Sequence, residues 1–340
     1  MAQSQKQALP RKDHSPRTVR DFEASDVLIF VENAAVTEGS VRHAHKVASA
    51  FGGSVVLVQV LCKPDNGKAP VDPIEWDITK QHNLKQLRLV TKKLEAVGKP
   101  CSVELLEGQC INQIKAFMED RQVDIAASTR PRSDTGWLST PTAWGVLLSK
   151  SAGVLMIPED AIIEPNARYR KILVPLDGSA RAEAALPVAT ILARAEDAEL
   201  IMCCVVHDTG PISFGTSDPE ADYLHDKIRR QNDQASRAYL DRIKKRLNHN
   251  GLTISAKVSH GSDARRTLID VMSSEKIDFV VMSTHGQSGH RDVSTGDVAR
   301  FVLDNADIPV LQVRPRNGRD SNHAFGKLSS EGLRQPSGTD

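Results

Sequence analysis

Short apolar runs alternate along the chain with longer segments in which apolar residues recur at helical spacing. VLIFV at 27–31 and ILVPL at 172–176 have the length and composition of buried strands. Behind the first run, Val41, Ala44 and Ala48 fall on one helical face, and Gly52 follows where that helix should end. Strands that alternate with helices predict an α/β fold in which helices cover a parallel sheet.

The second half of the chain repeats the first. Four pairs of segments correspond: VLIFVEN at 27–33 with ILVPLDG at 172–178, GSVVLVQVL at 53–61 with AELIMCCVV at 198–206, VDIAASTR at 123–130 with IDFVVMSTH at 277–285, and GVLMIP at 153–158 with PVLQVRP at 309–315. The extra residues of the second half fall between these segments, where loops absorb insertions at little cost. We therefore predict two tandem open parallel-sheet domains, at 21–158 and 168–316, joined by a linker at 159–167.

Helix ends are also visible in the second half. Ser179 is expected to cap a helix through ARAEAALPVATILARA, which Pro187 should kink because proline cannot continue the hydrogen-bond ladder. A long polar helix is predicted over about 223–247. The last helix should start near Asp297 and bury Val298, Phe301 and Val302 before the strand PVLQV.

Composition narrows the class of protein. Hydrophobic residues make up 40% of the 340 residues and charged residues 26%, as in ordinary globular proteins. The formal net charge of +1 provides no field to attract nucleic acid, and no apolar run reaches the roughly 18–20 residues that span a bilayer. Five cysteines without metal-ligand spacing favour a reducing cytoplasm. The polar ends, 1–20 (which is basic) and 317–340, are expected to be disordered tails.

Three features of the second half fall where predicted strands end, the edge at which open parallel sheets bind ligands. Asp177 can accept hydrogen bonds from a ribose or an adenine amino group, or it is a turn carboxylate that caps the next helix. The backbone around Val205 can contact an adenine edge, or it is plain buried strand. The loop from Ser283 to Gly296, with Gly286 inside it, lets N–H groups approach an anion, or it is a flexible surface loop.

These segments resemble the universal stress protein family. ILVPLDGSARAEAAL resembles the family's opening strand and helix, and FVVMSTHGQSGHRDVSTGDVARFVLDNADIPVLQV resembles its closing segment. Nucleotide-binding members carry Gly, two residues, Gly, nine residues, then Gly followed by Ser or Thr. The resemblance covers residues 170–315 and extends more weakly to 25–158. It implies a Rossmann-like, five-stranded parallel sheet flanked by helices, of the adenine-nucleotide α-hydrolase-like type.

The resemblance further implies ATP, with Mg²⁺ as its companion ion, held by a defined set of residues. They are Pro175, Asp177, Val205, Met282, Gly286, Gly296 and Val298, and the loop motif adds Ser283, His285 and Asp297. Two positions depart from the motif: Ser283 replaces its first Gly, and Asp297 replaces its Ser or Thr. A carboxylate accepts hydrogen bonds and repels phosphate, so Asp297 weakens binding unless it caps the helix or shares a metal with the nucleotide. His290 and Arg291 can compensate as cationic donors.

The corresponding site in the first half is degenerate. Glu32 replaces Asp177, and Pro131 replaces Gly286, which removes a backbone donor and restricts φ. Arg130 can still bind an anion, although a solvated loop is the simpler interpretation. The first domain is therefore expected to be a partner of the second rather than a second nucleotide site.

The sequence predicts a cytoplasmic stress-response regulator or sensor that binds ATP or a related adenine nucleotide in its second domain. Slow ATP hydrolysis is the most that is expected, because P-loop, serine-hydrolase and zinc-protease motifs are missing and no general base is identified. The scattered His260, His285 and His290 are not expected to bind a metal. One alternative is an interaction module that acts through protein partners without a nucleotide. The other is a nucleotide-dependent hydrolase or transferase.

Assembly is predicted from the closing strands. Domains of the family dimerise through this edge, so in a tandem chain GVLMIP at 153–158 is expected to pair with PVLQV at 309–313. Such pairing of the two domains hides two apolar strand edges that would otherwise aggregate. A homodimer of the whole chain is a further expectation, and neither a membrane nor a nucleic acid is expected as a partner.

Overall fold

The computed structural model describes residues 26–31, 37–62, 72–95, 101–121, 125–130, 146, 153–164, 166–207, 219–247, 251–284 and 296–314. Both predicted tails lie outside the described residues. So do Glu32, Pro131, His285, Gly286 and the rest of the loop up to residue 295, whose predicted roles stay predictions.

The chain forms two successive α/β halves. The elements of the first half are β1 (Val27–Val31), α1 (Glu38–Ala50), β2 (Val55–Cys62), α2 (Pro73–Glu95), β3 (Cys101–Gly108), α3 (Cys110–Arg121), β4 (Ile125–Arg130) and β5 (Gly153–Pro158). Those of the second half are β6 (Lys171–Leu176), α5 (Ala180–Glu183), α6 (Ala185–Glu196), β7 (Glu199–His207), α7 (Pro219–Leu247), β8 (Ile254–Gly261), α8 (Ala264–Ser274), β9 (Phe279–Ser283), α9 (Asp297–Asn305) and β10 (Val310–Val313).

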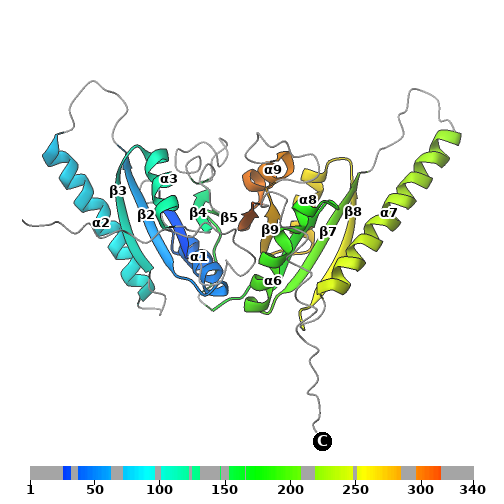
Figure 1. Ribbon diagram of the computed structural model, residues 1–340, viewed down its shortest axis with the longest axis horizontal. Helices are drawn as coiled ribbons and strands as arrows, with labels where there is room; N and C mark the ends of the chain where they lie inside the picture. Colours follow the sequence, from blue (N-terminus) through cyan, green and yellow to red (C-terminus); the bar gives the residue numbers. More distant parts are fainter. Residues whose placement is uncertain are drawn as a thin grey trace, which may run out of the picture.

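All ten of these strands belong to one sheet, in the order β3-β2-β1-β4-β5-β10-β9-β6-β7-β8 (Figure 1). Neighbouring strands within each half run parallel. In the middle of the sheet β5 and β10 run antiparallel, with Val310 opposite Met156 and Val313 opposite Gly153. The predicted α/β class with a parallel sheet in each half is confirmed.

Helices cover both faces of the sheet, which explains why its inner strands are apolar throughout. One buried cluster joins the sheet to α1, α5, α6 and α7, and a second cluster on the other face joins it to α3, α8 and α9. Every residue of β1, β5, β9 and β10 is buried. Strands buried on both faces lack the polar and apolar alternation of one-sided sheets.

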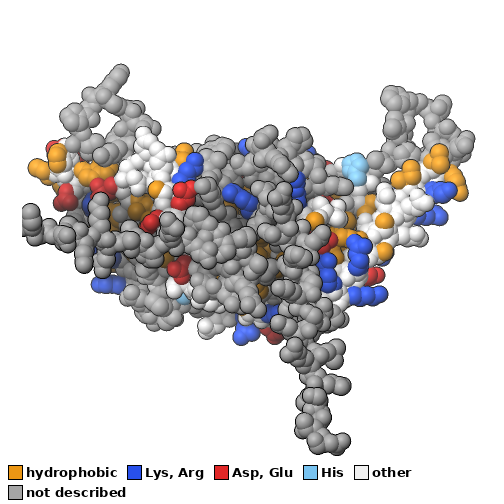
Figure 2. Space-filling model, viewed as in Figure 1, with side chains coloured by type: hydrophobic (Ala, Val, Ile, Leu, Met, Phe, Trp, Pro, Cys, Tyr) orange, Lys and Arg blue, Asp and Glu red, His pale blue; other side chains and the backbone are white. Residues whose placement is uncertain are grey.

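The two longest helices, α2 and α7, lie at the opposite outer ends of the molecule, and their N-terminal turns project in the same direction (Figure 1). Helix α2 packs on β3 and α7 packs on β8, the two outermost strands. Apolar side chains stay exposed in the N-terminal part of both helices (Figure 2). None of the described helices is both long and apolar enough to cross a membrane.

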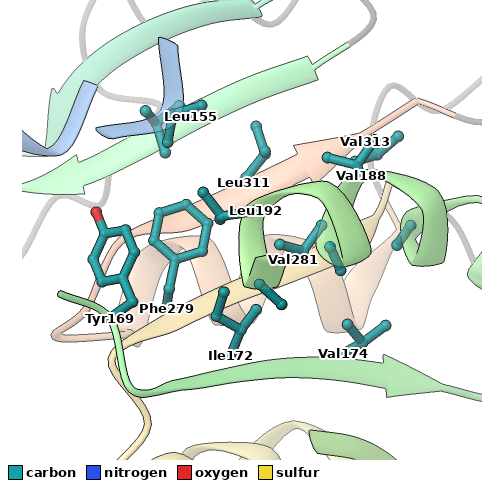
Figure 3. Packing of buried hydrophobic residues seen from close by; sticks show 14 of the residues in the cluster. Leu155, Tyr169, Ile172, Val174, Val188, Leu192, Phe279, Val281, Leu311 and Val313 are labelled. Carbon is teal, nitrogen blue, oxygen red and sulfur yellow. The ribbon is translucent and has the colours of Figure 1, made fainter. Parts of the chain in front are cut away.

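The core is continuous across the middle of the sheet (Figure 3). Leu155 of β5 lies opposite Leu311 of β10, and both are completely buried. Nearby, the ring of Tyr169 packs against that of Phe279 with 4.9 Å between their centroids. The contact of Leu155 with Leu311 joins the two halves, so the apolar surface between them is excluded from water as in the interior of one domain.

A buried polar network also crosses between the halves. The hydroxyl of Tyr169, just before β6, lies 2.7 Å from Nδ1 of His43 on α1. Glu196 of α6 accepts a hydrogen bond from the Tyr169 backbone N–H at 3.0 Å and forms an ion pair with Lys46 of α1 at 2.8 Å. Burial lowers the pKa of His43 to about 4, so its ring is neutral at physiological pH.

The helix after β6 breaks three residues before Pro187. Ser179 caps α5 as predicted, because its hydroxyl accepts a hydrogen bond from the N–H of Ala182 at 3.1 Å. The interruption falls at Ala184, between α5 and α6. Pro187 has no N–H to donate to the carbonyl of Glu183, four residues earlier, so the first turn cannot continue smoothly.

Truncation of Leu311 is expected to destabilise the whole molecule. Leu311→Ala leaves a cavity where β10 meets β5 and should lower the free energy of unfolding by about 2–5 kcal/mol, measured by urea denaturation. Leu89→Ala provides the matched control, since Leu89 is 47% exposed on α2. Equal losses in the two variants would contradict a core shared at this position.

The neutral state of His43 predicts loss of stability in acid. Its pKa in the folded protein lies below the unfolded value of 6.5, so folding releases protons and stability falls as the pH drops from about 6.5 to about 4. The shift corresponds to about 3 kcal/mol over this range. Urea denaturation at several pH values should show a flatter profile for His43→Gln, which cannot titrate. An unchanged profile would refute this, and His82→Gln on exposed α2 is the control.

Candidate functional site

The candidate site lies at the carboxyl ends of β6, β7 and β9. Strand β6 is flanked by β7 on one side and β9 on the other. From β6 the chain therefore continues to β7 on one side, and it later returns to form β9 on the other side of β6. Ligands of open parallel sheets bind at such a topological switch point, because the connections diverge there.

Asp177 follows β6 directly and holds a tight turn. Its Oδ1 accepts hydrogen bonds from the backbone N–H of Ser179 at 3.0 Å and from the Ser179 hydroxyl at 2.6 Å. Gly178 between them has a φ of +84°, which favours glycine. The carboxylate is exposed, whereas Pro175 is half-buried in the strand behind it. Asp177 therefore supports the turn through one oxygen while it stays accessible at the strand end.

Val205 lies beyond the end of the β6–β7 ladder. The pairing ends at Leu176 and Cys204, but β7 continues through Val205 to His207. The side chain of Val205 is half-buried, and on the other side its strand still pairs with β8. Strand β7 thus extends past the end of β6, at the position of Asp177. The edge of β7 that is not paired with β6 there is suited to contact with the edge of a planar ligand.

Two titratable side chains near this strand end, Cys204 of β7 and Tyr239 of α7, have raised pKa values. Cys204 is buried with its Sγ 3.7 Å from the hydroxyl of Ser236 on α7, and burial raises the pKa of its thiol. The hydroxyl of Tyr239 donates to Glu183 at 3.2 Å, and burial raises the pKa of that phenol as well. Both groups are neutral at physiological pH, so they present no charge to a ligand.

The strand β9 and helix α9 are joined at the base of the loop. Thr284 donates its N–H to the carbonyl of Val313 at 2.9 Å, and its own carbonyl accepts the N–H of Gly296 at 2.8 Å. Met282, Ser283 and Thr284 are buried. The N–H of Gly296 is thus engaged by a backbone carbonyl of the protein itself. The N–H groups at the start of α9 that have no acceptor within the helix are then those of Asp297, Val298 and Ala299, the last of which is buried.

Asp297 is the first residue of α9 and is exposed, while Gly296 is the N-cap. The alternative in which Asp297 caps the helix is therefore wrong. A carboxylate in the first turn still interacts favourably with the helix dipole. Of the three α9 residues that were predicted to be buried, Val302 is fully buried, whereas Val298 and Phe301 are only half-buried.

Arg265 of α8 is a neighbour of the site that the sequence did not reveal. It forms a forked ion pair with Asp263, the N-cap of α8, with Nη2 at 2.9 Å from Oδ2. Its guanidinium also lies over the ring of Phe301, 5.5 Å from the centroid. The hydrogen bonds to Asp263 raise the pKa of Arg265, and the charge of Asp297 adds to this effect. Arg265 thus places a permanent positive charge close to Asp297.

Arg130 of the first half contacts the same helix at its other end. Its guanidinium donates to the carbonyl of Asp304 at 2.8 Å and to that of Ala306. These are carbonyls of the last turn of α9, which have no partner within the helix. Both sequence interpretations of Arg130, anion ligand and solvated loop residue, are wrong.

His260, the described member of the three scattered histidines, has a different partner. Its Nε2 lies 3.1 Å from Asp233 of α7. Within the described part of the chain, no group of three or more His, Cys, Asp or Glu residues is arranged to hold a metal ion.

The second half matches a known family in sequence. The sequence model of the Universal stress protein family matches residues 168–314. Residues 168–314 form a universal stress protein domain. Universal stress protein MJ0531 of Methanocaldococcus jannaschii is 29% identical over 146 residues, 43% of this chain and 82% of that protein. Universal stress protein YxiE of Bacillus subtilis is 26% identical over 150 residues, 43% of this chain and 99% of that protein.

Solved structures extend the likeness in fold beyond the universal stress protein domain. A universal stress protein from Archaeoglobus fulgidus superposes with a TM-score of 0.62 at 17% identity, covering 86% of this chain and 97% of that one. The protein PA1789 from Pseudomonas aeruginosa, described as functionally unknown, gives 0.56 at 15% identity, covering 86% of this chain and 94% of that one. Coverage of this extent includes most of the first half, so both halves share the fold.

Proposed function

We propose that the protein is a cytoplasmic stress-response regulator that binds ATP or a related adenine nucleotide in the second of two tandem domains, 21–158 and 168–316. The observation that carries the proposal is the meeting of three features at one switch point: the exposed carboxylate of Asp177, the projecting strand at Val205, and the N-terminus of α9. The membership of residues 168–314 in the universal stress protein family supports the same site.

Each feature suits one part of a nucleotide. A carboxylate accepts hydrogen bonds from ribose hydroxyls or an exocyclic amine, and a strand edge offers backbone groups to a base. The first N–H groups of a helix, here those of Asp297 and Val298, favour a phosphate through direct hydrogen bonds and the helix dipole. The nucleotide would then extend from β6 and β7 across β9 to α9.

Asp297 opposes phosphate binding, and Arg265 offsets part of that effect. A carboxylate at the helix start repels a phosphate and cannot donate to it. The guanidinium of Arg265, held by Asp263, reduces the negative charge in this region. We therefore propose weak nucleotide binding and regulation rather than turnover, since no described residue is placed as a general base.

The engaged N–H of Gly296 favours a second candidate, an interaction module that acts without a nucleotide. The two functions make different predictions for calorimetric titration with ATP and Mg²⁺. Saturable heat supports the regulator, and the absence of heat at high micromolar nucleotide supports the interaction module. Steady phosphate release would instead indicate a hydrolase.

Removal of the Asp177 carboxylate is expected to weaken nucleotide binding. Asp177→Ala should raise the dissociation constant at least about tenfold, the effect of one lost charge-assisted hydrogen bond, measured by calorimetry. Asp177→Asn shows whether the loss comes from ligand binding or from an altered turn. The Asn amide oxygen can still accept the hydrogen bonds from Ser179 that hold the turn. Asp270→Ala, which removes an exposed carboxylate of α8, is the control. Equal affinities in all variants would place the nucleotide elsewhere.

Replacement of Asp297 by serine is expected to strengthen binding. Asp297→Ser removes a negative charge beside the phosphates and adds a hydroxyl donor, so the dissociation constant of ATP should fall about tenfold. Adenosine, which has no phosphate, should bind both proteins equally and serves as the control ligand. A similar gain for adenosine would show that Asp297 does not act on the phosphates.

A further inference from the structure

The exposed apolar residues of α2 and α7 occur in the same pattern. In α2, Ile74 and Ile78 are 71% and 64% exposed and lie four residues apart. In α7, Leu224 and Ile228 are 50% and 52% exposed at the same spacing. Residues four apart share one face of a helix. Single exposed apolar residues are normal, but two such pairs at matching places in a repeated fold form candidate contact surfaces.

The charge inside this pattern is reversed between the two helices. Asp77 lies between the two isoleucines of α2 in the sequence IEWDI, and Lys227 occupies the corresponding position of α7 in LHDKI. Exposed Glu75 adds a second negative charge next to Ile74 on α2. In α7, Asp226 and Arg230 are both exposed and lie four residues apart on another side of the helix, so Lys227 is the charged residue that shares the face of Leu224 and Ile228. Figure 2 shows apolar side chains beside acidic ones at the end of α2, and beside basic ones at the end of α7.

The opposite face of α2 makes the contacts within the chain. Trp76 donates its indole N–H to Glu107 of β3 at 3.0 Å, and Lys80 forms an ion pair with the same carboxylate. Further along the helix, Leu87 is buried. The Ile74 and Ile78 face is therefore not needed to hold α2 against the sheet, and it is available to a partner.

We propose that the partner is a second copy of this chain, joined through the α2 surface (Ile74, Glu75, Asp77 and Ile78) of each copy and the α7 surface (Leu224, Lys227 and Ile228) of the other. Apolar pairs of similar size face one another in this contact, and Asp77 meets Lys227. Contacts between like surfaces, α2 with α2 or α7 with α7, would bring equal charges together. Charge complementarity thus selects the mixed contact.

The positions of the two helices allow the contact to close on itself. Because α2 and α7 lie at opposite ends of the chain with their first turns projecting in the same direction, a twofold axis can form both contacts at once (Figure 1). A closed dimer satisfies both surfaces of each copy and leaves none to recruit a third chain.

Sedimentation of the full chain over a concentration series tests the proposal. The wild type should show a monomer–dimer equilibrium. Ile74→Asp/Ile78→Asp and Leu224→Asp/Ile228→Asp should each raise the dissociation constant by at least about 100-fold, because four apolar side chains, two in each copy, no longer become buried. Leu89→Asp, a change at another exposed apolar residue of α2, should leave the dimer intact. Circular dichroism of each variant checks that the helices still fold.

Charge exchange gives the sharper result. Glu75→Lys/Asp77→Lys and Lys227→Glu should each be monomeric alone, because equal charges then meet at both contacts. An equimolar mixture of the two should form a heterodimer, since each of its two contacts again joins opposite charges. A monomeric wild type, a dimer unaffected by the charge changes, a mixture that stays monomeric, or species that grow beyond the dimer would overturn the proposal. Nucleotide titration of the same variants is independent of this outcome, because no altered residue lies at the candidate site.

Discussion

The antiparallel pairing of β5 with β10 is the contact on which the rest of the structure depends. Each half ends in a short, completely buried strand whose backbone donors and acceptors on one edge have no partner within that half. An exposed apolar strand edge of this kind would pair with any other chain. The pairing satisfies both edges at once and turns two five-stranded sheets into one sheet of ten strands.

The same pairing gives the degenerate half a structural role. It brings Arg130 of β4 to the carboxyl end of α9, the helix whose other end contributes to the candidate site. It also brings His43 and Lys46 of α1 against Tyr169 and Glu196. The first half therefore fixes the position of the half that carries the candidate site. Selection on these contacts would retain the fold of the first half without its ligand chemistry.

Sequence patterns predicted the strands and helices well, because the residues that indicate a strand or a helix lie within that segment itself. Apolar runs indicated the buried strands, and Ser179 indicated the start of α5. The long polar helix was placed correctly although its first turn begins earlier, at Pro219. Contacts between residues distant in the chain could not be predicted. The carbonyls of Asp304 and Ala306 that bind Arg130, and the carbonyl of Thr284 that accepts from Gly296, become neighbours only in the folded sheet.

The start of α9 shows why a motif alone does not determine a site. The loop motif treats Gly296 and the next residue as successive phosphate donors, but here the Gly296 N–H closes the base of the loop. The charge of Asp297 in turn has to be considered together with Arg265, which belongs to a different helix and to no motif. Affinity for a phosphate at this position depends on the sum of these charges and on the N–H groups of the first turn of α9. A change in either charged residue therefore shifts phosphate affinity even when every glycine of the motif is kept.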